Sequence, residues 1–151
     1  MKKLLFLLSL ITIVASCKKE KSPEEQLLFD IELIKKYNTD KGLNAQATPE
    51  GVYFVIETDG TGTQTPTPSN IVNVKYKGYL LDGTVFDQST TGIEFRLSGL
   101  IQGWQIGLQK FKKGAKGKLL IPSGLGYGSN AQGGIPANSV LVFDIELVNI
   151  K

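Results

Sequence analysis

Histidine is absent from the 151 residues, and cysteine occurs once, at Cys17. The absence of histidine excludes serine or cysteine catalysis with a histidine base, and it removes the commonest side-chain ligand of transition metals. A single cysteine cannot form a disulfide within the chain. A reaction carried out by this chain therefore has to need no strong nucleophile.

A strong excess of charge is also lacking. The chain has 17 lysines and arginines against 14 aspartates and glutamates, a formal charge of +3. Proteins that bind nucleic acids usually carry a dense basic surface, so the composition argues against a nucleic-acid partner. The 17 glycines indicate many turns and a strand-rich fold. The length favours one domain with a tail or an arm.

Residues 1–16 have the pattern of a secretory signal peptide. Lys2 and Lys3 precede the apolar run Leu4–Val14, which is shorter than the roughly 20 residues that span a bilayer. The run ends in Val14-Ala15-Ser16-Cys17, which resembles a bacterial lipobox. This resemblance implies that Cys17 is lipidated and anchors residues 17–21, a charged tether, to a membrane. An ordinary signal peptide that leaves a free cysteine is the alternative.

A helical arm and its linker are expected over residues 22–47. Ser22 can cap the helix, Pro23 suits the first helical position and Glu25 completes a capping box. The expected apolar stripe runs to about Tyr37 and consists of Leu27, Leu28, Ile31 and Ile34. The arm either packs on the following domain or pairs with a second copy of the chain, so the oligomeric state stays open.

Residues 48–151 form the predicted globular domain, in which apolar residues alternate with a period of two, the pattern of strands. Asp82-Gly83 has the sequence of a hairpin turn. A polar connection is expected at Gln88–Gly92. The expected strands are Gly51–Thr58, Ile71–Leu81, Thr84–Asp87, Ile93–Leu97, Ala115–Ile121 and Val140–Ile150.

One short helix interrupts these strands, and it holds the only tryptophan. Ile101, Trp104 and Leu108 share one face of it, while Gly103 and Gly107 flank the indole and keep its approaches free. The indole is either a core anchor or the floor of an apolar pocket. The pattern predicts an α+β fold, in which a five- to six-stranded antiparallel sheet curves around this helix and follows the N-terminal arm.

Six segments in a fixed order carry a family resemblance. They are Val74–Leu80 (VKYKGYL), Asp82–Ser89 (DGTVFDQS), Leu100–Trp104 (LIQGW), Ile121-Pro122 with Tyr127-Gly128, Gly134–Pro136 (GIP) and Leu141–Leu147 (LVFDIEL). Together they resemble the FK506-binding-protein (FKBP) type of peptidyl-prolyl cis-trans isomerase, over about Val52–Ile150. The resemblance implies an FKBP-like sheet and catalysis of rotation about X–Pro bonds.

This reaction needs none of the residues that the sequence lacks. Rotation about an X–Pro bond has a barrier of about 20 kcal/mol that arises from amide resonance. The twisted transition state is less polar than the planar amide, so a dry apolar pocket favours it. We therefore expect no cofactor and no metal.

The resemblance also implies roles for individual residues. Trp104 is the floor under the proline ring, and Asp87 is the polar group near the twisting carbonyl. The backbone N–H of Ile101 and the hydroxyl of Tyr127 hold substrate carbonyls. Ile93 stands where many members have an aromatic wall residue. The remaining walls and the cover over the pocket are Tyr76, Phe86, Leu100, Phe143 and Ile135.

The implied substrates are proline-containing exported polypeptides, and a macrolide of the FK506 type is a further candidate ligand. The expected location is the cell envelope of a bacterium, where a lipid on Cys17 anchors the chain to a membrane that faces the periplasm or the surface. Two other functions stay open. One is a module whose pocket binds a proline loop without turnover, and the other is the chaperone subunit of an envelope complex.

Overall fold

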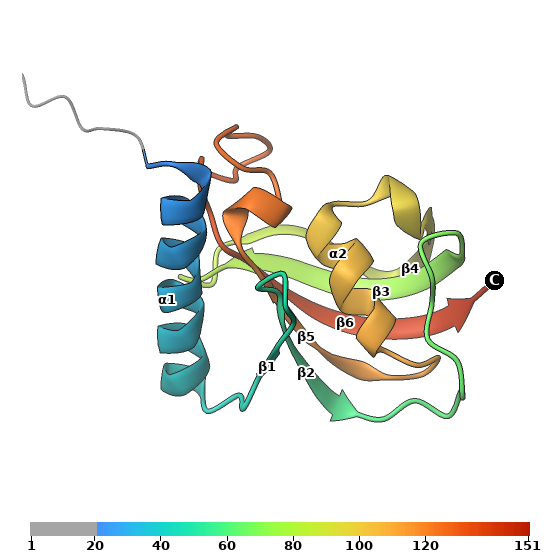
Figure 1. Ribbon diagram of the computed structural model, residues 1–151. Helices are drawn as coiled ribbons and strands as arrows, with labels where there is room; N and C mark the ends of the chain where they lie inside the picture. Colours follow the sequence, from blue (N-terminus) through green and yellow to red (C-terminus); the bar gives the residue numbers. More distant parts are fainter. Residues whose placement is uncertain (1–20) are drawn as a thin grey trace, which may run out of the picture.

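The computed structural model describes residues 21–151 (Figure 1). The expected signal peptide, Cys17 and most of the tether lie outside these residues. The helices are α1 (Pro23–Lys41) and α2 (Gln102–Gly107), with the single-turn helices η1 (Leu97–Gly99), η2 (Leu108–Lys110) and η3 (Ser123–Leu125). The strands are β1 (Gln46–Ala47), β2 (Tyr53–Thr58), β3 (Ile71–Leu80), β4 (Val85–Arg96), β5 (Lys116–Ile121) and β6 (Leu141–Ile150).

The strands form one sheet in the order β1-β2-β5-β6-β3-β4, and all neighbours are antiparallel. The predicted α+β architecture, with an antiparallel sheet of five to six strands, is confirmed. The hairpin between β3 and β4 closes where expected, because Gly83 donates to the carbonyl of Leu80 at 2.9 Å and takes a φ of +91°. Glycine adopts this left-handed conformation without strain.

Two of the six strands differ from the prediction. Gln88–Gly92 is not a connection but the middle of β4, which runs unbroken from Val85 to Arg96. The sixth strand is instead the short β1, within the predicted linker. β4 is an edge strand, and its middle is largely exposed, so polar residues there disturb no core. The pairing register shifts between Val74 and Tyr76, which marks a bulge in this strand.

The two faces of the sheet carry the two helices. α2 covers the inner face, where Val74, Leu119 and Phe143 belong to the main hydrophobic core. α1 packs on the outer face, where its Ile34 contacts a second core that contains Leu120 and Val142. Alternation along β5 and β6 therefore supplies both cores from the same strands.

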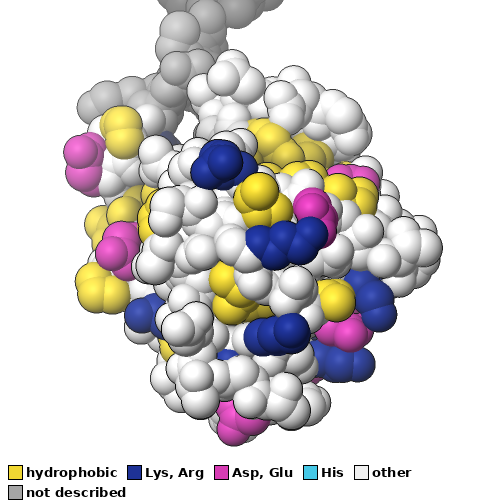
Figure 2. Space-filling view, turned by 90° about the vertical axis from the view of Figure 1, so that its right-hand side faces the viewer, with side chains coloured by type: hydrophobic (Ala, Val, Ile, Leu, Met, Phe, Trp, Pro, Cys, Tyr) yellow, Lys and Arg dark blue, Asp and Glu magenta, His cyan; other side chains and the backbone are white. Residues whose placement is uncertain are grey.

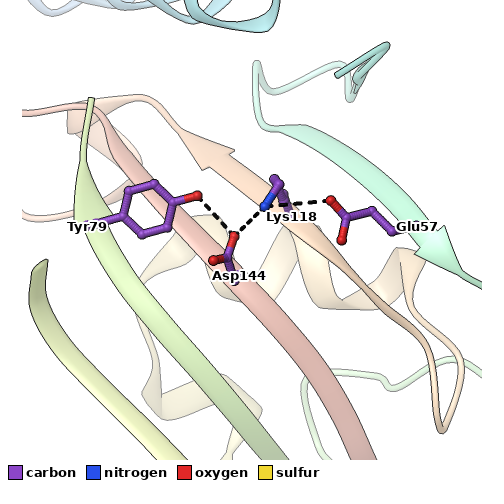
Figure 3. A network of polar contacts seen from close by, with 4 residues as sticks. All are labelled: Glu57, Tyr79, Lys118 and Asp144. Atoms are coloured by element: carbon purple, nitrogen blue, oxygen red, sulfur yellow. Dashed lines mark hydrogen bonds and ion pairs between the residues drawn. The ribbon is translucent and has the colours of Figure 1, made fainter. Parts of the chain in front are cut away.

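The rest of the outer face is charged. Figure 3 shows Asp144 between Tyr79 and Lys118, with Glu57 on the far side of the lysine. Asp144 Oδ1 accepts from the Tyr79 hydroxyl at 2.9 Å and from Lys118 Nζ at 2.6 Å, and Lys118 lies 3.6 Å from Glu57. Burial lowers the pKa of Lys118, but the hydrogen bond and charge of Asp144 outweigh it and hold this pKa above its usual value. These side chains tie β2, β5, β6 and β3 together.

The basic side chains on one side of the molecule are dispersed. On the side of the molecule that faces right in Figure 1, lysines and arginines stand apart from one another, among uncharged and acidic side chains (Figure 2). Within residues 21–151, no helix has the length and apolar character needed to cross a bilayer.

The arm begins as predicted. Ser22 Oγ accepts from the Glu25 amide, and the Glu25 carboxylate accepts from the Ser22 amide. The helix continues past Tyr37 to Lys41 and ends at Gly42 in a left-handed conformation. Its buried face also differs from the predicted stripe. Asp30 and Ile34 are the buried residues, whereas Leu28 keeps 65% of its surface exposed. Contact with the domain, not apolarity alone, decides which face is covered.

Candidate active site

A small pocket opens on the inner face of the sheet beside α2, with a volume of about 160 Å³. Pockets for drug-sized ligands usually measure roughly 300–1,000 Å³, so this one suits a single side chain. Every predicted site residue of the globular domain except Ile135 lines it, and Phe95 is an additional member. The lining residues are Tyr76, Phe86, Asp87, Phe95, Leu100, Ile101, Trp104, Tyr127 and Phe143.

Trp104 lies at the centre of an aromatic cluster and is 4% exposed. The rings of Tyr76, Phe95 and Phe143 stand nearly perpendicular to its indole, at centroid distances of 5.3, 6.2 and 5.2 Å. Such edge-to-face pairs are favourable beyond the area they bury. The indole is therefore fixed by three neighbours, and it serves both as core and as a wall of the pocket.

Two glycines seat α2 against β5. A Cβ on Gly103 would collide with the side chain of Ile121, and one on Gly107 would lie 2.5 Å from Cδ2 of Leu119. Both glycines are buried. The sequence suggests that they keep the approaches to the indole free, but in the structure they allow the helix to lie close to the sheet. This close approach sets the depth of Trp104.

Asp87 supplies the carboxylate of the pocket, and Tyr76 orients it. The Tyr76 hydroxyl donates to Oδ2 of Asp87 at 2.7 Å. Burial, together with this hydrogen bond and the charge of Asp87, raises the pKa of Tyr76 to about 12. The phenol therefore stays protonated at neutral pH and keeps its hydrogen bond to Asp87.

Tyr127 presents a free hydroxyl to the same pocket. Burial, and secondarily the charge of Asp87, raises its pKa. Its hydroxyl has no hydrogen-bond partner among residues 21–151. A protonated, unpaired phenol at a pocket wall is available to donate to a ligand carbonyl.

The backbone N–H of Ile101 is a second free donor. Ile101 precedes the first residue of α2, and no acceptor for its amide lies within the described part of the chain. The segment before it is fixed from the helix, because Nε2 of Gln105 donates to the carbonyls of Leu100 at 2.7 Å and Ser98 at 3.3 Å. The pocket thus has two donors in defined positions.

Two residues that the sequence places near the rim, Ile135 and Ile93, are absent from the lining of this pocket. Ile135 does not line the pocket: its side chain is 6% exposed and packs into the inner-face core, while its backbone forms an isolated β-bridge with the exposed Gln132. Ile93, which stands where many family members have an aromatic wall residue, is 41% exposed and does not line the pocket, whereas Phe95 of the same strand does. Both residues follow the same alternation along β4, so the strand pattern contained the signal for Phe95.

Within residues 21–151, no group of three or more aspartates and glutamates lies close enough to hold a metal ion.

Known proteins that resemble this chain share one description. Residues 62–148 match the family of FKBP-type peptidyl-prolyl cis-trans isomerases. The FKBP-type peptidyl-prolyl cis-trans isomerase FkpA of Escherichia coli is 41% identical over 140 residues, which are 91% of this chain and 51% of that protein. FkpA of Buchnera aphidicola subsp. Schizaphis graminum is 44% identical over 135 residues, 87% of this chain and 53% of that protein. The chain thus spans about half the length of these relatives.

Solved structures agree with the sequence matches. The crystal structure of Escherichia coli FkpA aligns with a TM-score of 0.74 at 40% identity, covering 85% of this chain and 60% of that one. A peptidyl-prolyl cis-trans isomerase from Pseudomonas syringae pv. tomato aligns with the same TM-score at 34% identity, covering 88% of this chain and 98% of that one. The chain therefore belongs to the family of FKBP-type peptidyl-prolyl cis-trans isomerases.

Proposed function

We propose that this chain is a peptidyl-prolyl cis-trans isomerase that accelerates rotation about X–Pro bonds in exported polypeptides. The observation that supports it best is the pocket itself. It has the size of one side chain and an aromatic lining, and it holds two unpaired donors and one oriented carboxylate. Family membership supports the same reaction.

The apolar lining favours the transition state. The proline ring would lie on the indole of Trp104, between Tyr76, Phe86 and Phe143. As the amide twists, its nitrogen becomes pyramidal and the carbonyl loses the charge that resonance delivered to it. A pocket without water penalises the planar, polar amide more than the twisted one, so the barrier falls.

The polar groups hold the flanking parts of the peptide. The Tyr127 hydroxyl and the Ile101 N–H would donate to two substrate carbonyls, which fixes the chain on both sides of the rotating bond. Asp87 would lie near the carbonyl that turns, in the position that its bond from Tyr76 defines. No step transfers a proton or forms a covalent bond, in agreement with a sequence that lacks histidine.

The first experiment measures isomerisation of a short X–Pro peptide by this chain. We expect a rate well above the uncatalysed reaction and constant between about pH 6 and 9. The constancy follows because the pKa of Tyr76 is raised to about 12 and that of Tyr127 is also raised, so both phenols keep their protons there. A decline is expected only above about pH 10.

Two results would contradict this proposal. A rate equal to the uncatalysed one would favour a module that binds proline loops without turnover. A rate that changes steeply near neutral pH would show that a titrating group takes part. Adding an FK506-type macrolide to the same assay reports by inhibition whether it occupies this pocket.

The location is also a proposal, and it rests on the lipobox pattern before Cys17. We expect the chain to sediment with membranes and Cys17→Ser to release it into the soluble fraction, because the lipid is the anchor. Lys18→Ala is the matched control, since it keeps the cysteine and should stay with the membranes. A Cys17→Ser variant that still sediments with membranes would refute lipid anchoring.

A further inference from the structure

A buried carboxylate joins the arm to the domain. Asp30 of α1 is 0% exposed, and its Oδ2 accepts from the backbone N–H of Ser123 at 2.7 Å and from the Ser123 hydroxyl at 2.6 Å. Its other oxygen accepts from Nε2 of Gln26 at 2.7 Å. No lysine or arginine of residues 21–151 forms an ion pair with Asp30. Three donors therefore satisfy the carboxylate without a counter-charge.

Ser123 in turn holds both neighbours of Tyr127. Its carbonyl accepts from the amide of Gly126 at 3.0 Å and from that of Gly128 at 2.8 Å. Ser123 is itself 1% exposed and begins the single-turn helix η3. Figure 1 shows this turn, coloured orange, between α1 and α2. One residue thus receives the carboxylate of the arm on one side and fixes the segment that carries Tyr127 on the other.

We infer that Asp30 is a positioning residue, through which the arm sets the place of the Tyr127 hydroxyl in the pocket. This inference rests on the proposed function, because it assumes that Tyr127 binds a substrate carbonyl. The path has few steps: Asp30 fixes Ser123, Ser123 fixes Gly126 and Gly128, and these flank Tyr127. Two charge-assisted hydrogen bonds to one oxygen define that position closely.

The chemistry of the contact argues for positioning over simple docking. The arm already docks through apolar contacts of Ile34 with Leu120 and Val142. A buried carboxylate pays a large desolvation penalty, and an apolar residue in its place often stabilises a protein as well or better. The carboxylate adds a defined geometry, since its hydrogen bonds form only when the donors of Ser123 point at its oxygen. This geometry constrains the segment that carries Tyr127, and Tyr127 lines the pocket.

The test compares substitutions at both ends of the contact in the full-length chain. We expect Asp30→Ala to lower kcat/KM for an X–Pro peptide by about tenfold, because the Tyr127 segment loses its fixed point. Ser123→Ala removes only the hydroxyl donor and should have a smaller effect in the same direction. Asp30→Asn keeps an acceptor for Ser123 and should restore most of the activity. Asp40→Asn, on the exposed end of the same helix, is the control and should behave like the wild type.

A double substitution separates positioning from general loosening. If Asp30 acts through Tyr127, adding Asp30→Ala to Tyr127→Phe should change kcat/KM by no more than about twofold, whereas independent effects would multiply. Hydrogen exchange at the amides of Gly126 and Gly128 gives a readout that needs no activity, and we expect it to accelerate in Asp30→Ala.

The outcomes distinguish this inference from the proposed function. An active wild type with unchanged kcat/KM and unchanged exchange in Asp30→Ala would overturn the inference and leave the isomerase intact. Full multiplication of the effects of Asp30→Ala and Tyr127→Phe would overturn it as well. A wild type without isomerase activity would overturn the proposed function, and with it any role of Asp30 in holding a substrate.

Discussion

Replacing Trp104 with alanine is expected to abolish most isomerase activity and to lower the free energy of unfolding by about 3–5 kcal/mol. The indole is 4% exposed and touches three aromatic rings, so its removal opens a cavity that these rings cannot fill without leaving their positions. It is also the proposed floor under the proline ring. The same cavity would admit water, which stabilises the planar amide relative to the twisted one.

Phe111→Ala is the matched control for this prediction. Phe111 is 0% exposed and belongs to the same core, but it does not line the pocket. Its truncation should lower stability to a similar extent, while activity per folded molecule stays near that of the wild type. Denaturant unfolding gives the stabilities, and peptide assays below both unfolding temperatures give the activities. Equal loss of activity in both variants would show that Trp104 matters only as core.

Features that depend on neighbouring residues were predictable from the sequence. The capping box at Ser22 and Glu25 and the hairpin at Asp82-Gly83 are local motifs, and each forms as expected. The alternation along β3 and β6 places Val74 and Phe143 on the inner face, where the structure finds them. Local propensity and the period of hydrophobicity agree with the fold in these segments, so no tertiary contact has to override them.

Features that depend on distant residues were not predictable in the same way. The continuity of β4 comes from its pairing with β3. Because β4 lies at the edge of the sheet, it tolerates polar residues, and no local sequence pattern predicts that the strand continues through them. The loop that carries Ile135 turns this side chain into the core, although its sequence is consistent with a cover over the pocket. In both cases a contact across the fold decides between two local readings.

The contact of Asp30 with Ser123 is the extreme case, since 93 residues separate the two. A signal was nonetheless present. Asp30 and Ile34 are four residues apart and share one face of α1, so the aspartate is a charged residue on the face that Ile34 buries. Such a charge needs partners, and the sequence alone does not say which part of the domain provides them.

Replacing Gly103 with alanine is the second substitution with a large expected effect. The sequence alone does not show whether it raises or lowers the free energy of unfolding. Alanine favours a helix over glycine by about 1 kcal/mol, so an isolated helix would gain stability. In this fold the added Cβ would collide with three side-chain atoms of Ile121, which is 0% exposed. Overpacking of a filled core usually costs about 1–3 kcal/mol. We therefore expect a net loss of stability.

In this variant we expect folded molecules to lose activity as well, beyond what unfolding alone would cause. Relief of the clash moves α2 away from β5 and carries Trp104 and the Ile101 N–H with it. Displacement of a pocket floor and a donor together should lower kcat/KM by about tenfold or more. Gly99→Ala is the control, since a Cβ there meets nothing within 4 Å and its φ is not left-handed. Combining Gly103→Ala with Ile121→Ala restores space, so the pair should recover part of the lost kcat/KM. A Gly103→Ala protein that is more stable and fully active would mean that the depth of α2 does not set the geometry of the pocket.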